Sequence, residues 1–303
     1  MYDIIVIGAG PAGLTAALYA RRANKSVLII EKDGFGGQIT HSPKIENFPG
    51  FASVSGIELA DAMVEQVLGQ GAEVELCCVT NVRAEGDVRI VETDAGTFEA
   101  KAVIIAAGVK HRTLGLPGED ALEGHGVSYC AVCDGAFFAG RHVAVIGGGN
   151  SALQEAILLA ERCTKVTIVQ NLAMLTGEQK LQDVLHSRDN VEFIFNTVVD
   201  SLQGESELTG LHLHDTEKDT FTDLPVDGMF VCIGLAPNNG AFAEVAALND
   251  YGYVDSDERC LTGTPGVFVA GDCRSKAIRQ ITTASADGAV AALAACRYVD
   301  YGN

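Results

Sequence analysis

The chain has 303 residues, of which 48% are hydrophobic and 34 are glycine, so it can bury more than one core and we expect two domains. Its 40 acidic residues outnumber its 21 Lys and Arg, and the net charge of −19 argues against nucleic acid or anionic lipid as a partner. Nine dilute cysteines and the lack of an apolar run near the roughly 18 residues of a membrane span predict a soluble, cytoplasmic protein.

A strand, a tight turn and a helix are predicted at the start of the chain. The apolar run 2–7 leads, without the basic region of a signal peptide, into Gly8-Ala9-Gly10-Pro11-Ala12-Gly13 and a helical pattern. In this pattern the first glycine permits the turn, the second lets the backbone approach a pyrophosphate, and the third lets the helix pack on the strand. The next strand ends in Glu31, whose carboxylate can accept hydrogen bonds from ribose hydroxyls. These features predict a dinucleotide site.

The only cysteine pair at dithiol spacing lies in the middle of the chain, in Cys130-Ala131-Val132-Cys133-Asp134. Two intervening residues let a single turn bring both sulfurs within bonding reach, and such pairs commonly hold one thiol as a reactive thiolate. Asp134 could supply or accept the proton that moves with the electrons. The pair alone is compatible with redox chemistry, half a zinc site or coincidence, but no second ligand pair of the kind that zinc needs is present. We expect no metal.

A second strand, turn and helix are predicted after the cysteines. The strand 141–146 leads into Gly147-Gly148-Gly149-Asn150-Ser151-Ala152, and a helical pattern follows. The residue after the next strand is Gln170 rather than an acid, and the residues behind it offer no guanidinium for a 2′-phosphate. A second dinucleotide site is therefore expected, with an unusual residue at the position that selects the cofactor; a glycine-rich turn without a ligand is the other interpretation.

The order of these segments suggests that one domain is inserted in the other. The first pattern continues to an apolar run at 103–108, and a further strand, far beyond the second pattern, ends in Gly271-Asp272. We predict an α/β fold of two Rossmann-like three-layer dinucleotide-binding domains. Residues 113–240 form the second domain, inserted between residues 1–112 and 241–303 of the first.

Together these motifs resemble those of the low-molecular-weight thioredoxin reductases and of the related C-terminal flavoprotein region of alkyl hydroperoxide reductase. The resemblance covers essentially the whole chain, with seven motifs in the family's order. The motifs are Gly8 to Gly13, Gly36-Gly37-Gln38, Ile45 to Gly50, Cys130 to Gly135, Gly147 to Ala152, Ala270-Gly271-Asp272 and Arg279-Gln280-Ile281.

The resemblance implies a homodimeric enzyme that passes electrons from a reductant through FAD and the Cys130–Cys133 disulfide to thioredoxin or a similar protein. Cys133 would face the flavin, and Asp134 would protonate a departing thiolate. The residues that the resemblance assigns to FAD are Gly8, Gly10, Pro11, Ala12, Gly13, Glu31, Gly37, Gln38, Asn47, Ala107, Gly108, Gly271, Asp272, Arg279, Gln280 and Ile281. Those assigned to the nicotinamide cofactor are Gly147, Gly149, Asn150, Ser151, Ala152 and Gln170.

One segment departs from the family pattern. NADPH-using members carry a His-Arg-Arg run and a further Arg where this chain has Gln170 to Thr176. NADPH is therefore disfavoured, and Gln170 could hydrogen-bond the ribose hydroxyls of NADH. Some relatives take electrons from ferredoxin instead, although the retained Gly147, Gly149 and Ala152 argue against this donor.

Two other functions would use the same residues. The first is an FAD-dependent dithiol oxidase, which closes a small-molecule disulfide and passes the electrons to oxygen. The second is a flavin-binding regulatory or interaction protein with a vestigial redox centre. We expect the other seven cysteines to be structural, including Cys232 as a small hydrophobic residue in an apolar strand.

Overall fold

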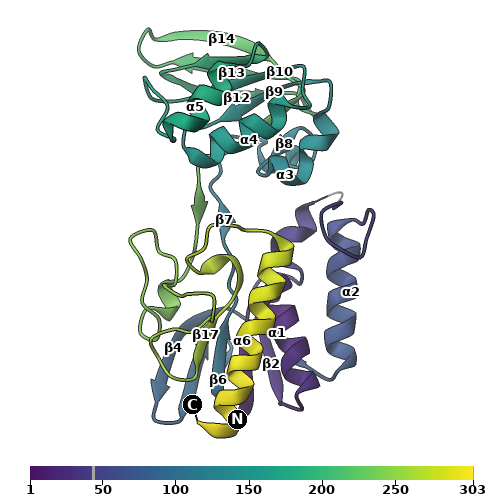
Figure 1. The fold of residues 1–303 in the computed structure, drawn as a ribbon, viewed down its shortest axis with the longest axis vertical. Coiled ribbons are helices and arrows are strands. Elements are labelled where there is room, and N and C mark those ends of the chain that lie inside the picture. Colours follow the sequence, from purple (N-terminus) through teal and green to yellow (C-terminus); the bar gives the residue numbers. More distant parts are fainter. Residues whose placement is uncertain (43–44, 303) are drawn as a thin grey trace. The chain divides into compact units, whose positions relative to one another are not determined.

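The computed structural model describes residues 1–42 and 45–302. The chain divides into two compact units, Met1–Lys110 with Ala236–Asn303, and His111–Leu235. The sequence places the two crossings between domains after residues 112 and 240; the structure places them in the short paired strands β7 (Lys110–His111) and β16 (Leu235–Ala236). In Figure 1 the first unit runs from purple to blue and from green to yellow, and the second runs from teal to green.

The first unit contains a seven-stranded sheet in the order β3-β2-β1-β6-β5-β4, with β17 also paired to β6. Strands β1, β2, β3, β6 and β17 run parallel, whereas β5 is antiparallel to its neighbours β6 and β4. The strand bounds are β1 Tyr2–Ile7, β2 Val27–Glu31, β3 Glu73–Leu76, β4 Val79–Glu85, β5 Val88–Thr93, β6 Gly96–Ile105 and β17 Val267–Val269. The helices are α1 Pro11–Arg22, α2 Gly56–Gly69 and α6 Ile281–Tyr301.

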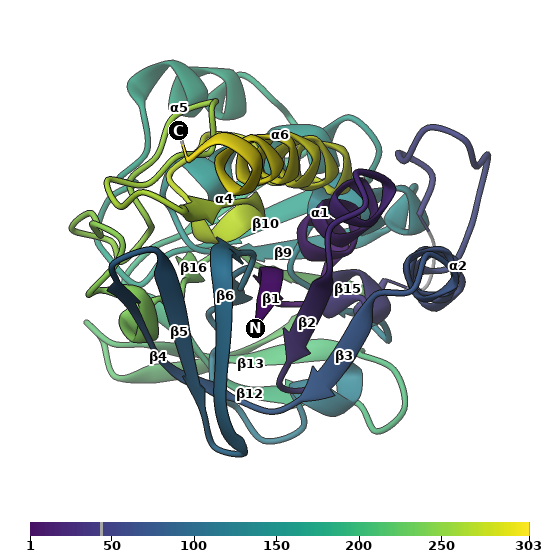
Figure 2. The same ribbon diagram turned by 90° about the horizontal axis from the view of Figure 1, so that it is seen from below.

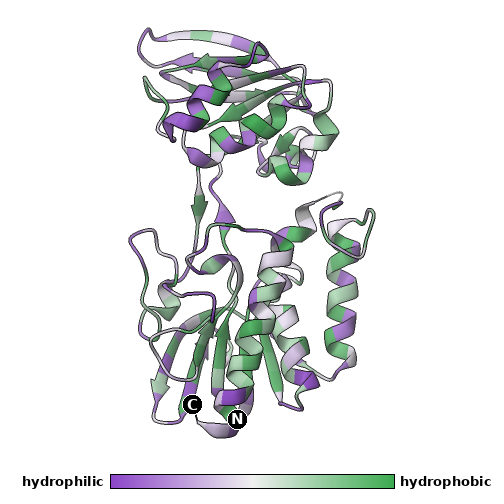
Figure 3. Cartoon of the chain, viewed as in Figure 1, coloured by the Kyte–Doolittle hydropathy of each residue, from purple (hydrophilic) through white to green (hydrophobic). Residues whose placement is uncertain are grey.

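The central strands of this sheet are buried on both faces, which explains their nearly continuous apolar sequences (Figure 3). Helices α1 and α6 lie side by side on one face of the sheet (Figure 2). Small residues allow this close packing, because a Cβ on Gly288 of α6 would lie 2.2 Å from the carbonyl oxygen of Ala12 in α1. The first turn of α1 is thereby held against the last helix.

The second unit contains a parallel five-stranded sheet in the order β11-β10-β9-β15-β8 and an antiparallel sheet in the order β12-β13-β14. One face of the parallel sheet packs against α4, and the other packs against the antiparallel sheet. The parallel strands are β8 Val127–Ser128, β9 His142–Ile146, β10 Lys165–Val169, β11 Val191–Ile194 and β15 Gly228–Val231. The antiparallel strands are β12 Thr197–Gln203, β13 Gly210–Asp215 and β14 Thr220–Pro225, and the helices are α3 Ala131–Asp134, α4 Asn150–Ala160 and α5 Gln179–His186.

The predicted α/β fold of two Rossmann-like domains, the second inserted in the first, is confirmed. One glycine motif forms the turn between β1 and α1 in the first unit, and the other forms the turn between β9 and α4 in the second. Within residues 1–42 and 45–302, no helix has both the length and the apolar character to cross a membrane.

Candidate active site

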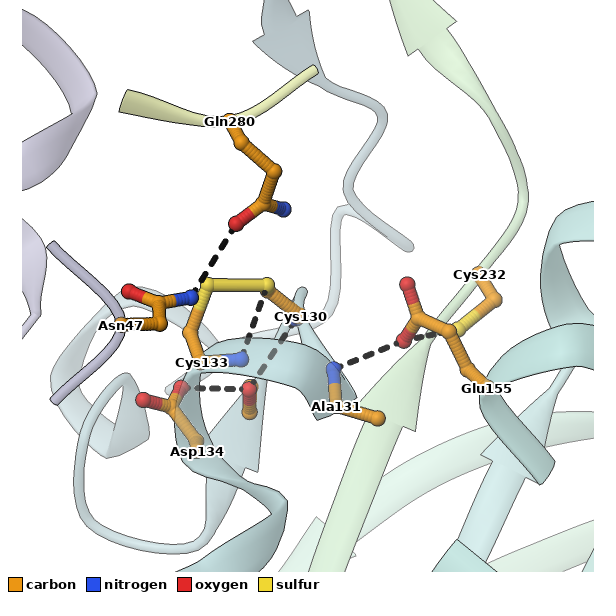
Figure 4. Close-up of a disulfide and its surroundings, with 9 residues drawn as sticks. Asn47, Cys130, Ala131, Cys133, Asp134, Glu155, Cys232 and Gln280 are labelled. Atoms are coloured by element: carbon orange, nitrogen blue, oxygen red, sulfur yellow. Dashed lines mark hydrogen bonds between the residues drawn. A yellow bond between two sulfur atoms is a disulfide. The ribbon is translucent and has the colours of Figure 1, made fainter. Parts of the chain in front are cut away.

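The two cysteines of the dithiol motif form a disulfide, with their Cα atoms 5.3 Å apart (Figure 4). Cys130 is the N-cap of the four-residue helix α3, and its sulfur accepts a hydrogen bond from the backbone N–H of Cys133 at 3.2 Å. Val132, between the cysteines, is 50% exposed. The segment that carries the disulfide is thus one ordered turn with an apolar side chain open to solvent.

Asp134 ends this turn and is the carboxyl group next to Cys133 in the chain. Its Oδ2 accepts a hydrogen bond from the Ser128 hydroxyl at 2.6 Å, and the same hydroxyl oxygen accepts the N–H of Cys130 at 3.2 Å. Its Oδ1 is buried and has no hydrogen-bond partner among the described residues. Burial raises the pKa of Asp134, against the opposing effect of the Ser128 hydrogen bond. The carboxyl group therefore keeps its proton to a higher pH than an ordinary aspartate.

Sequence reasoning missed two residues next to this turn. Glu155 of α4 accepts the N–H of Ala131 at 2.9 Å and the thiol of Cys232 at 3.2 Å, both at Oε2 (Figure 4). Cys232 follows β15 and packs against the same core as α4, but its thiol also donates to Glu155, so it is not simply a small hydrophobic residue. The sequence offers one signal for Glu155, its place one turn after Ser151 on the helix that follows the second glycine motif.

The first glycine turn is as crowded as its sequence predicts. Gly8 has a φ of 105°, and a Cβ there would lie 2.3 Å from the carbonyl oxygen of Ala106. A Cβ on Gly13 would lie 1.9 Å from the carbonyl oxygen of Gly8. The buried Glu31 carboxylate accepts the N–H of Ala9 at 2.7 Å, so it also holds the turn itself, a role that the motif does not reveal.

A Gly13→Ala substitution tests this packing. We expect the free energy of unfolding to fall by about 2–3 kcal/mol and bound flavin to be lost, because the added methyl overlaps the backbone of Gly8. Thermal unfolding and the flavin absorbance of the purified protein measure the two effects. Gly34→Ala is the matched control in the same unit, since a Cβ there meets no atom within 4 Å. A stable, yellow Gly13→Ala protein would contradict the expectation.

The residues expected at the other end of the flavin come from distant segments of the first unit. Asn47 Nδ2 donates to Gln280 Oε1 at 3.1 Å, and the Arg279 guanidinium lies over the Tyr253 ring at 4.4 Å. Asp272 lies in a short turn with its Oδ1 buried and without a hydrogen-bond partner among the described residues. Burial raises its pKa, while the charges of Lys276 and Arg279 oppose this shift. An unsatisfied buried oxygen of this kind suits a ligand hydroxyl.

The remaining residues expected at FAD all lie in the first unit. Gly10 caps α1 and Pro11 begins it, Gly37 and Gln38 begin a 3-10 helix (Gly37–His41), and Ile281 begins α6. Ala107 and Gly108 follow β6, Ala12 lies in the first turn of α1, and Gly271 has a φ of 78° beside Asp272.

The second glycine turn borders a cavity of about 1060 Å³ within the second unit. Gly147, Gly149, Asn150, Ser151 and Gln170 line the cavity, whereas Ala152 packs in the core behind it. Gln170 is 4% exposed, and its amide nitrogen donates to the Met174 carbonyl at 3.2 Å. A Cβ on Gly148 would lie 2.5 Å from that same nitrogen. Gln170 thus forms part of the floor of the cavity rather than a free side chain.

The cations around this cavity are few. Among the described residues that line it, Arg112 is the only one with a guanidinium group, and it lies outside the segment 170–176. The segment itself contributes Gln170, Asn171, Leu172 and Thr176, all uncharged. This segment therefore offers no charge to a 2′-phosphate.

Comparison with known proteins agrees with this geometry. Residues 2–288 match the model of the pyridine nucleotide-disulphide oxidoreductase family. The chain is 43% identical over 301 residues to a thioredoxin reductase of Listeria monocytogenes, covering 99% of this chain and 94% of that one. It is 41% identical to a thioredoxin reductase of Bacillus subtilis, covering 99% and 95% of the two chains. The crystal structure of thioredoxin reductase from Streptococcus pyogenes matches with a TM-score of 0.94 at 42% identity, covering 99% of this chain and 98% of that one.

The dithiol turn, the two glycine turns and the full-length similarity all lead to one assignment. This chain belongs to the thioredoxin reductases of the pyridine nucleotide-disulphide oxidoreductase family.

Proposed function

We propose that this protein is a flavin-dependent reductase of thioredoxin or a similar small disulfide protein, with Cys130 and Cys133 as its redox pair. The observation that carries the proposal is the Cys130–Cys133 disulfide, which lies in a partly buried turn next to Asp134, whose carboxyl group has a raised pKa. A test is the reduction of thioredoxin by the purified holoenzyme with a suitable donor. Protein that consumed oxygen with a small dithiol and left thioredoxin oxidised would instead be a dithiol oxidase.

The residues of the first unit fit FAD. The first turn of α1 offers backbone N–H groups that the helix itself does not use to a pyrophosphate, and the buried oxygen of Asp272, which has no partner among the described residues, can accept a hydrogen bond from a ribityl hydroxyl. We assign Asn47 and Gln280 to the same cofactor. FAD, when bound, supplies the pair of electrons that reduces the disulfide.

The chemistry of the chain's own residues follows from the turn. Reduction breaks the S–S bond, and the two sulfurs take up two electrons and two protons when both become thiols. Asp134 is placed to supply one of these protons, since it is protonated to a higher pH than usual. One cysteine thiolate then attacks the substrate disulfide, and the other resolves the mixed disulfide, which regenerates Cys130–Cys133. The exposed Val132 offers apolar contact to the incoming protein.

We propose NADH as the electron donor, bound along the second glycine turn. The support is the buried, uncharged Gln170 and the absence of a cation in the described segment 170–176. Anaerobic titration of the flavin absorbance with NADH, NADPH and reduced ferredoxin measures the preference. We expect NADH to bleach the flavin at a concentration at least about tenfold below NADPH, because a 2′-phosphate would find no guanidinium in this segment. Equal or better bleaching by NADPH would refute NADH as the donor. Bleaching by reduced ferredoxin alone would show that ferredoxin, and not a nicotinamide, supplies the electrons.

Two further properties follow from the resemblance to the family. We propose that the protein acts as a homodimer and in the cytoplasm. Sedimentation equilibrium of the holoenzyme measures the first, and fractionation of its host cells measures the second.

A further inference from the structure

Glu155 connects three parts of the second unit that sequence reasoning treats separately. It lies on α4, and its Oε2 accepts the N–H of Ala131, the first residue of the dithiol helix, at 2.9 Å. The same oxygen accepts the thiol of Cys232 at 3.2 Å, and Cys232 lines the cavity beside Gly147. Figure 4 shows the carboxyl group between Ala131 and Cys232.

The dithiol helix depends on such outside acceptors. With only four residues, α3 cannot satisfy its first N–H groups internally. The Ser128 hydroxyl accepts from Cys130, the Cys130 sulfur and carbonyl oxygen accept from Cys133, and Glu155 accepts from Ala131. Ala131 is 3% exposed and packs in the same core as α4. Glu155 therefore attaches the backbone between the two cysteines to a long helix.

The charge of Glu155 also acts on this turn. Burial raises its pKa and the nearby Asp134 raises it further, whereas the two donors lower it. Burial raises the pKa of Cys232 well above its usual range, so this group remains an S–H donor. The titratable groups that act on Glu155 are thus Asp134, which ends the dithiol turn, and Cys232 after β15, and its bond to Ala131 attaches it to the residue that follows Cys130. An ionised Glu155 opposes a second negative charge on a nearby sulfur.

We propose that Glu155 is a positioning residue of the redox pair. It fixes the backbone that carries both cysteines, and its negative charge favours the disulfide over a reduced form that carries a thiolate. This rests on the proposed function in taking Cys130–Cys133 as the pair that cycles. The charge acts only where reduction leaves a thiolate. At low pH both sulfurs bind protons on reduction, and a neighbouring charge then has little effect on the equilibrium.

The test uses Glu155→Gln, which keeps an acceptor oxygen of the same reach but removes the charge. Holoenzyme is equilibrated in dithiothreitol buffers, where oxidation of dithiothreitol supplies the two electrons, and the alkylated Cys130–Cys133 peptide is quantified by mass spectrometry. We expect the equilibrium to shift towards the dithiol by about three- to tenfold near pH 8.5 and by less than about twofold near pH 6. Glu161→Gln is the matched control, since Glu161 is the exposed C-cap of the same helix and pairs with Arg188 at 3.5 Å. It should leave the dithiol–disulfide equilibrium unchanged at both pH values.

Each outcome decides for or against the proposal. An unchanged equilibrium in Glu155→Gln, or a shift of equal size at both pH values, overturns it. If Glu155→Gln does not fold, Glu155→Asp replaces it. This variant keeps the charge, so the dithiol–disulfide equilibrium should stay within about twofold of wild type at both pH values. A larger shift that does not depend on pH overturns the proposal. A wild-type disulfide that dithiothreitol cannot open would refute the proposed function as well, so the two failures are distinguishable.

Discussion

Protein with Cys133→Ser should lose thioredoxin reduction by at least about a thousandfold, because a serine oxygen cannot form the disulfide with Cys130 that cycles in each turnover. The flavin should stay bound at wild-type stoichiometry, since the residues that we assign to FAD belong to the other unit. Steady-state reduction of thioredoxin measures the loss, and the flavin absorbance per chain measures the binding. The donor should still bleach the flavin while no electrons reach thioredoxin, because the disulfide comes after the flavin in the proposed electron path.

Cys78→Ser is the matched control for this variant. Cys78 is a free and exposed cysteine of the first unit, so its replacement should leave turnover within about twofold of wild type. Near-normal turnover in Cys133→Ser would mean that the dithiol is vestigial. That result would support the hypothesis of a flavin-binding regulatory protein, or an electron path that bypasses the disulfide.

The parts of the fold that the sequence predicts well are those with local causes. Gly8 needs a positive φ, and Gly13 needs close contact with Gly8, so both requirements lie within one short turn. The disulfide is a similar case, because two intervening residues suffice to bring its sulfurs together. Alternation between apolar strands and helices then gives the α/β fold with its inserted domain.

The parts that the sequence does not predict depend on contacts between distant residues. Asp287 looks like a surface residue of a helix rich in small residues, yet its side chain is only 8% exposed. Its carboxylate accepts from the N–H of Gly271, from Arg274 and from Lys276, which fixes the turn that carries Asp272. No local sequence pattern predicts this network, because the donors Gly271, Arg274 and Lys276 lie outside the helix that carries Asp287. The same reason hides the contact of Glu155 with Cys232, which are 77 residues apart in sequence.

Asp134→Asn should slow disulfide reduction and turnover by about a hundredfold or more, which is the usual contribution of a positioned proton donor. The amide keeps the size of the side chain and its contact with Ser128, but it has no titrating proton. The sign of the pH dependence follows from the direction of the shift. Because burial raises the pKa of Asp134, its protonated form persists to a higher pH than usual, and the wild-type rate should fall as pH rises through that raised pKa.

In Asp134→Asn this fall should disappear, which separates loss of a proton donor from a general loss of structure. Rates of thioredoxin reduction between about pH 5 and pH 9 give both profiles. Asp120→Asn is the matched control in the same unit, because Asp120 is exposed in a short 3-10 helix and should change neither the rate nor the profile. If Asp134→Asn kept the wild-type rate and the wild-type profile, the proton would have to come from water or another group. The buried oxygen of Asp134 without a hydrogen-bond partner among the described residues would then need a different explanation.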